Sequence, residues 1–225
     1  MEEPVATTGA VTAGARRPIA ARNSAWAARV TRWLVEHNVT PNAISLASIG
    51  FAGLAAIAIA ATRWTPWPWL KSTLFLIAIV AIQSRLLCNL FDGMVAVEGR
   101  KSGKAGEVFN DFPDRIADPL IFIASGYAAT RWGVPLGWLA AVLAVMTAYV
   151  RELGRSLGAG TYFIGPMAKQ HRMAVMTVVC AVAAVEVFGR GYRVMLDITL
   201  AIICVGCIVT MIRRTKRIIR DLESR

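Results

Sequence analysis

Long runs of apolar residues with almost no charge recur along this chain, and they constrain its fold more than any other feature. Most of them approach the roughly 20 residues that a helix needs to cross a bilayer. Hydrophobic residues make up 56% of the chain and charged residues 17%, whereas about a quarter of the residues in a soluble domain are charged. We therefore predict an all-α integral membrane protein with six transmembrane helices. The runs are Ile44–Thr62, Thr73–Asn89, Pro119–Thr130, Pro135–Val150, Met173–Phe188 and Val194–Ile212.

The third run is too short to span a membrane alone. Pro119–Thr130 reaches the required length only if its helix extends back through Asp118, Asp114 and Asn110. That extension puts carboxylates at membrane depth, where ionisable side chains are rare and usually functional. We therefore expect the functional site at the start of this helix.

The distribution of basic residues indicates the orientation. With both termini inside, the cytoplasmic segments contain 18 Lys and Arg residues and the opposite side contains 5, as the positive-inside rule requires. Both termini and the candidate site are thus expected on the cytoplasmic side of the cell inner membrane. Basic residues at a membrane face attract anionic lipid headgroups, so the net charge of +11 does not indicate nucleic acid as a partner.

The sequence divides into four predicted segments, of which one contains all the apolar runs. Residues 1–20 are rich in Ala, Thr and Gly and are expected to be disordered. Residues 21–38 place Trp26 and Trp33 on one face and Arg29 and Arg32 between them, which suits an amphipathic helix in the membrane interface; an ordinary helix packed on protein is the alternative. Residues 39–217 form the membrane domain, and residues 218–225 form a basic tail.

Oxygen-bearing side chains cluster on the second and third predicted spans. Asn89 and Asp92 are three residues apart and share one helix face. Asn110, Asp114 and Asp118 follow at intervals of four and stack along one face of the next helix. Such ligands suit hard cations such as Mg²⁺, Mn²⁺ or Ca²⁺. The alternative is that the acids only form ion pairs, with Arg85 and Arg115.

Basic residues gather on the same side of the membrane. Arg151 and Arg155 end the fourth span with Glu152 between them, and Lys169 and Arg172 open the fifth beside His171. Clustered cations near a metal site are what a phosphorylated substrate requires. The positive-inside rule, together with lipid contact, is the alternative explanation for these residues.

The stretch from Asn89 to Asp114 resembles the CDP-alcohol phosphatidyltransferases, membrane enzymes that synthesise phospholipids. Their pattern is D-x-x-D-G-x-x-A-R, then eight residues, then G-x-x-x-D-x-x-x-D. All the spacings are kept here, and Val39-Thr40-Pro41-Asn42 is similar to the usual entry to the first span. The resemblance extends over residues 39–217. Three positions depart from the pattern, because Asn89 and Asn110 replace aspartates and Val97 replaces the arginine.

This resemblance implies transfer of a phosphatidyl group from CDP-diacylglycerol to an alcohol, with release of CMP. In the family, the first three aspartates bind two divalent ions that clamp the diphosphate, and the last is the base for the alcohol. Here it assigns metal binding to Asn89, Asp92, Asn110 and Asp114, with Mg²⁺ or Mn²⁺ as the ion and Asp114 as the base. Gly93, Ala96 and Gly106 would admit the nucleotide, and Arg151, Arg155, Lys169 and Arg172 would receive a phosphate on the acceptor.

Two other functions stay open at the level of sequence. The two asparagines make the site about two charges poorer, so the chain could be a catalytically weakened relative that binds a nucleotide or a lipid phosphate. A small transporter or lipid-binding scaffold is the other alternative, although its polar residues would have to extend through the whole membrane depth. The acceptor alcohol is not identified, and members of the family tend to form homodimers.

Overall fold

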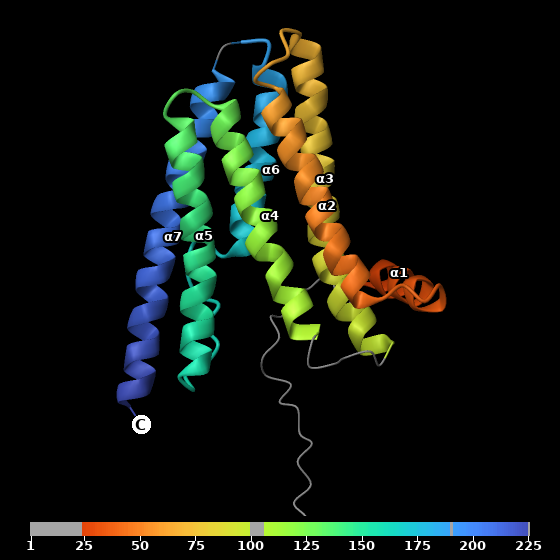
Figure 1. Ribbon diagram of the computed structural model, residues 1–225, viewed down its shortest axis with the longest axis vertical. Coiled ribbons are helices and arrows are strands. Elements are labelled where there is room, and N and C mark those ends of the chain that lie inside the picture. Colours follow the sequence, from red (N-terminus) through yellow and green to blue (C-terminus); the bar gives the residue numbers. More distant parts are fainter. Residues whose placement is uncertain (1–23, 100–105, 190, 225) are drawn as a thin grey trace, which may run out of the picture.

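The computed structural model describes residues 24–99, 106–189 and 191–224, without the side chains of a few residues at the start of one helix. This part of the chain is all α-helical (Figure 1). The predicted disordered segment 1–20 lies outside the described residues. The helices are α1 Ala25–Glu36, α2 Pro41–Ala61, α3 Pro68–Glu98, α4 Gly106–Ala128, α5 Gly133–Ser156, α6 Lys169–Glu186 and α7 Tyr192–Glu223.

Four of the described helices are long and apolar enough to cross a membrane: α2, α3, α5 and α7. The protein is therefore an all-α membrane protein with four candidate spans. Helices α4 and α6 run alongside these four in the bundle (Figure 1). Charged residues at their beginnings interrupt the apolar composition, which is why length and composition alone do not place α4 and α6 among the candidate spans.

Local sequence explains where the helices around the site begin. The hydroxyl oxygen of Thr40 accepts a hydrogen bond from the amide of Ala43 at 3.2 Å, and Pro41 occupies the first turn of α2, so both expected start signals are present. Helix α4 continues from Gly106 to Ala128 through two internal prolines, Pro113 and Pro119. The extension predicted for the short third run is therefore confirmed.

Helix α2 packs against both α3 and α4, whereas α3 and α4 contact each other little. Side chains in the core are mainly small: 12 alanines lie in its main apolar cluster together with Phe75, Ile82 and Phe122. Small residues allow helix backbones to approach closely in membranes. Large aliphatic residues such as Ile57, Val80 and Val185 are exposed on the outside of the bundle, as a lipid-facing surface requires.

Helices α4 and α5 approach most closely through glycines. A Cβ atom placed on Gly126 would lie 3.1 Å from the Cα of Gly137 and closer still to the carbonyl oxygen of Gly133. Real Cβ atoms rarely lie that close to backbone, so no larger residue fits there without moving a helix. This contact fixes the position of α4, and hence of its acidic residues, against α5.

Helix α1 lies across the direction of the bundle (Figure 1). Its Ala27 and Thr31 are buried, while Trp26 and Trp33 are about half exposed. The Trp26 ring contacts Phe91 of α3 edge-on, with 5.8 Å between the ring centroids. One face of α1 thus packs on the C-terminal half of α3, and exposed aromatic rings lie on α1 beside this contact.

Candidate functional site

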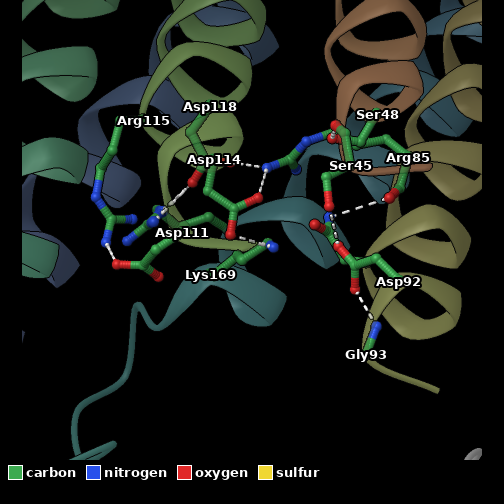
Figure 2. A network of polar contacts seen from close by, with 12 residues as sticks. Ser45, Ser48, Arg85, Asp92, Gly93, Asp111, Asp114, Arg115, Asp118 and Lys169 are labelled. Atoms are coloured by element: carbon green, nitrogen blue, oxygen red, sulfur yellow. Dashed lines mark hydrogen bonds and ion pairs between the residues drawn. The ribbon is translucent and has the colours of Figure 1, made fainter. Parts of the chain in front are cut away.

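The site lies where the C-terminal half of α3 faces the beginnings of α2, α4 and α6. Asp92 of α3 is buried, and its two carboxylate oxygens have separate partners. The Ser45 hydroxyl donates to Oδ2 at 2.8 Å, and the amide of Gly93 donates to Oδ1 at 2.6 Å. Figure 2 shows this carboxylate on the α3 side of the polar network. Asp92 is thereby fixed in orientation, and it forms no direct ion pair with any residue that the structure describes.

Asp114 and Asp118 of α4 share one cation. Nη2 of Arg85 donates to Asp114 Oδ1 at 3.0 Å and to Asp118 Oδ1 at 2.6 Å. Lys169, the first residue of α6, forms an ion pair with the other oxygen of Asp114. The three helices α3, α4 and α6 are therefore linked through two carboxylates (Figure 2). The ion pairs that the sequence left as an alternative are present here.

Arg85 lies in the middle of α3 and is fully buried. Among the described residues, only Nη2 of its guanidinium has hydrogen-bond partners, and Nε and Nη1 have none there. A charged donor without a partner in a buried position costs several times what an ordinary hydrogen bond contributes. The two carboxylates must therefore compensate the charge of Arg85 almost entirely by themselves.

Arg172 completes the buried network. Its Nη2 donates to Asp118 Oδ2 at 2.6 Å, and its Nη1 donates to the Thr147 hydroxyl at 3.0 Å and to the Met167 carbonyl at 2.9 Å. These contacts tie α6 to α4, α5 and the segment before α6. Because its donors are engaged inside the protein, Arg172 acts in this structure as a buried structural cation.

A second network lies nearer the surface. Arg151 Nη2 donates to both oxygens of Asp111, at 2.9 and 3.0 Å, and Arg115 pairs with the same carboxylate. Arg151 Nε also donates to Glu152 at 2.8 Å, and Arg155 lies 3.8 Å from Glu152. The pairing predicted for Arg115 is thus present, and two of the predicted phosphate-binding arginines lie beside a glutamate.

The remaining predicted residues are placed as follows. Asn89 is half-buried, and its Nδ2 donates a hydrogen bond to the Arg85 carbonyl at 3.0 Å. The side-chain oxygen Oδ1 takes no part in this bond. Gly93 and Ala96 follow Asp92 on α3 and are half-buried. The side chain of Asn110 and the surroundings of Gly106 lie outside the described residues.

The structure brings Asp92, Asp114 and Lys169 close enough to interact electrostatically across the space between α3 and α4. It also reveals two contributors that spacing did not indicate, Ser45 and Thr147. The signal for Ser45 was weak because serine is common in apolar helices. The roles of Arg85 and Arg172 had a stronger signal, since an arginine inside an apolar run needs a buried acid as its partner.

The described residues offer oxygen donors, but no acidic cluster, to a divalent cation. They contain no group of three acidic, His or Cys side chains that could form a metal cluster. Asp92, Asp114 and the amide oxygen of Asn89 are hard oxygen donors of the kind that Mg²⁺ and Mn²⁺ prefer. With two carboxylates and one amide, the donor set suits one such ion, provided that Lys169 releases Asp114.

Two curated proteins are similar to the chain in sequence. A phosphatidylinositol phosphate synthase from Streptomyces avermitilis is 26% identical over 199 residues, which cover 84% of this chain and 76% of that protein. The inner membrane protein YnbA from Escherichia coli is 24% identical over 148 residues, covering 64% of this chain and 67% of that protein. No family model matches the sequence.

Solved structures are similar in fold. The crystal structure of Mycobacterium tuberculosis phosphatidylinositol phosphate synthase with bound CDP-DAG aligns with a TM-score of 0.63 at 17% identity, covering 87% of this chain and 94% of that one. A second structure of that enzyme, in complex with manganese and citrate, aligns with a TM-score of 0.62 at 18% identity over 85% and 88% of the two chains. The fold of this chain therefore also occurs in the solved structures of a phosphatidylinositol phosphate synthase.

Proposed function

This chain is a distant homologue of the CDP-alcohol phosphatidyltransferase family, and from this premise we propose that it transfers a phosphatidyl group from a CDP-linked lipid to an alcohol. The single observation that carries the proposal is the placement of Asp92 and Asp114 on facing helices at one end of the bundle. These are the two motif aspartates that the sequence retains. The products are CMP and a phospholipid.

In this proposal, the residues of the site have separate roles in the reaction. Asp92, fixed by Ser45 and Gly93, would hold one divalent cation together with Asp114 and the Asn89 oxygen. Such an ion, Mg²⁺ or Mn²⁺, would supply charge neutralisation for the phosphate oxygens and for the CMP leaving group. Asp114 accepts the proton of the acceptor hydroxyl, which then attacks the phosphorus that carries the lipid.

Two charged groups adjust the site to this role. Arg85 holds the Asp114 carboxylate in place through its shared Nη2. The Lys169 side chain is 25% exposed, more than the 9% of its partner Asp114, so it exchanges Asp114 for a phosphate on the lipid or on the acceptor when substrates bind. Arg151, which pairs with Asp111 one turn before Asp114 on α4, and Arg155 lie at the same end of the bundle and attract a phosphorylated acceptor.

The proposed topology follows from the same arrangement. Helices α4 and α6 cross the membrane with the four candidate spans, because they run alongside them (Figure 1). Both termini and the site then face the cytoplasm, and α1 lies in the interface with Trp26 and Trp33 toward lipid. Residues 39–217 form the membrane domain in this proposal.

The test is release of CMP by the purified protein with Mn²⁺, CDP-diacylglycerol and a panel of phosphorylated and unphosphorylated alcohols. Asp92→Asn and Asp114→Asn should each abolish release, whereas Asp197→Asn, a helical aspartate of α7 that bonds to Thr130, should keep it. Absence of CMP with every acceptor would contradict the enzyme proposal.

A weakened relative is the second candidate, and a specific observation favours it: Lys169 and Arg85 already compensate Asp114. Binding of a CDP-lipid without turnover would support it. Equilibrium binding of CDP-diacylglycerol to the wild type and to Asp92→Asn, measured beside CMP release, distinguishes the two functions, because only the enzyme shows both activities.

A further inference from the structure

A cavity of about 440 Å³ lies at the end of the bundle remote from Asp92 and Asp114. Three arginines from different parts of the chain line it. Arg63 follows α2, Arg131 lies between α4 and α5, and Arg193 is in the first turn of α7. Ser45, which contacts Asp92, is near the other end of α2. The 21 residues of α2 correspond to about 30 Å, so the cavity is separate from the candidate active site.

Positive charge in this cavity is poorly compensated by the protein. No carboxylate lines it within the described part of the chain. One acid, Asp197, accepts a hydrogen bond from the lining residue Thr130, and one acid does not balance three arginines. Arg63 forms no ion pair with any residue of the described ranges. Three arginines that line one cavity repel one another electrostatically, and an anion bound among them would remove that repulsion.

The placement of these arginines is also unusual for the topology. Their side of the membrane contains only 5 of the chain's 25 Lys and Arg residues, and three of the five converge on one cavity. Arg131 stacks over the Trp132 ring with 5.0 Å to its centroid, and Arg193 Nε donates to the Tyr192 hydroxyl at 3.2 Å. Both contacts orient a guanidinium and leave its other donors available.

The remaining wall is apolar and lies in an aromatic zone. Tyr127, Ala129 and Val134 complete the lining, and Trp64 and Trp132 beside it are strongly exposed. Tryptophans gather at the level of lipid headgroups. The volume lies within the range of small-molecule sites, about 300–1,000 Å³. Guanidinium groups recognise phosphate oxygens in pairs, and the apolar wall suits the glycerol and the upper acyl chains.

We propose that this three-arginine cavity binds the phosphodiester headgroup of an anionic phospholipid in the leaflet opposite the candidate active site. The proposal does not depend on the proposed function. Each arginine near an anionic lipid contributes roughly a fivefold increase in affinity, and three contribute about a hundredfold.

The test uses the full chain in detergent with added phosphatidylglycerol, phosphatidylcholine or inorganic phosphate. Thermal unfolding and native mass spectrometry report lipid binding. Phosphatidylglycerol should raise the unfolding temperature and remain bound, and phosphatidylcholine should do neither. The triple variant Arg63→Gln, Arg131→Gln, Arg193→Gln should unfold at the wild-type temperature without lipid and bind phosphatidylglycerol about a hundredfold more weakly.

A matched variant removes three exposed arginines elsewhere: Arg29→Gln, Arg32→Gln, Arg220→Gln. It should keep the binding, because it loses the same charge without altering the cavity. The proposal is overturned if the first triple variant binds phosphatidylglycerol as the wild type does, or if phosphatidylcholine binds equally well. An equal effect of inorganic phosphate alone would assign the cavity to the free anion and reject the lipid.

Discussion

Asp114 and Asp118 are one helical turn apart, yet their partners give them different roles. Both carboxylates share Arg85, but the second partner of Asp118 is Arg172, whose side chain is 6% exposed, whereas that of Asp114 is Lys169, whose side chain is 25% exposed. A buried pair exchanges slowly with other ligands, and the more accessible amine can leave. Asp118 therefore serves the fold, and Asp114 is the carboxylate that remains available for chemistry.

Replacing Asp118 should strongly destabilise the protein. Asp118→Asn leaves the charges of Arg85 and Arg172 without their shared acid, and removing one partner of a buried ion pair costs about 3–5 kcal/mol. The matched change Asp111→Asn breaks a more exposed pair with Arg151 and should cost less than about 1 kcal/mol. Unfolding of both variants in detergent, followed by circular dichroism, measures the difference. Equal losses would argue against a structural role for Asp118.

Replacing Lys169 should increase the affinity for a divalent cation. Lys169→Met removes the amine that competes for Asp114, and a gain of about 1.4 kcal/mol in cation binding corresponds to a tenfold lower Kd. Titration of Mn²⁺ followed by electron paramagnetic resonance measures this directly. Lys71→Met, at the other end of α3, should leave the Kd unchanged. Weaker Mn²⁺ binding by Lys169→Met would show that the lysine does not compete with the ion.

The same variant should separate metal binding from acceptor binding. If Lys169 receives a phosphate, Lys169→Met raises the KM for a phosphorylated acceptor even though the metal binds more tightly. The KM for an unphosphorylated acceptor should change little. A steady-state comparison of the two acceptor classes measures this split, and an equal change for both would remove Lys169 from acceptor recognition.

At the scale of the helices, the contact between α4 and α5 is the most sensitive to side-chain size. Gly126→Ala places a methyl group against the backbone of Gly133 and Gly137 and should destabilise by about 1–3 kcal/mol. Gly53→Ala, where a Cβ meets nothing within 4 Å, should be neutral or stabilise by up to about 1 kcal/mol, the difference in helix propensity. Opposite signs in the shift of the unfolding temperature are expected. A neutral Gly126→Ala would mean that the two helices lie further apart.

Sequence periodicity and hydropathy predict helices well where the signal is local. The run Ile44–Thr62 is α2 with its cap at Thr40, and the backward extension of Pro119–Thr130 is α4. Helix α3 continues to Glu98, nine residues past the apolar run that predicted it. The difference arises because hydropathy reports the lipid-embedded part of a helix, whereas backbone hydrogen bonds continue into its polar end.

Contacts between helices were less accessible to sequence reasoning. The spacing of Asp114 and Asp118 predicted a shared face, but it did not specify whether Arg85, Arg172 or a metal ion faces it. That choice depends on how α3, α4 and α6 are rotated and shifted relative to one another, which is a property of packing. The partner of Asp92, Ser45, is 47 residues away, and no local pattern connects them.

At the scale of the whole molecule, six spans and four spans predict different sides for the connections. If α4 and α6 cross the membrane, Ser156→Cys and Ser224→Cys should react with a membrane-impermeant maleimide from one side, and Trp64→Cys and Trp132→Cys from the other. The native cysteines Cys180, Cys204 and Cys207 are buried and should react slowly. Labelling in right-side-out and inverted vesicles measures this. Reaction of Ser156→Cys from the side of Trp64→Cys would exclude the six-span topology.

The burial of Arg85 has a consequence for biosynthesis. An arginine at the centre of a helix opposes release into the bilayer by about 2.5–3.5 kcal/mol or more, and its two carboxylate partners lie on the helix synthesised next. Helix α3 would enter the lipid with an unmatched charge if it left the translocon alone. We therefore expect α3 and α4 to be integrated together as a hairpin, with the ion pairs formed before either helix meets the hydrocarbon.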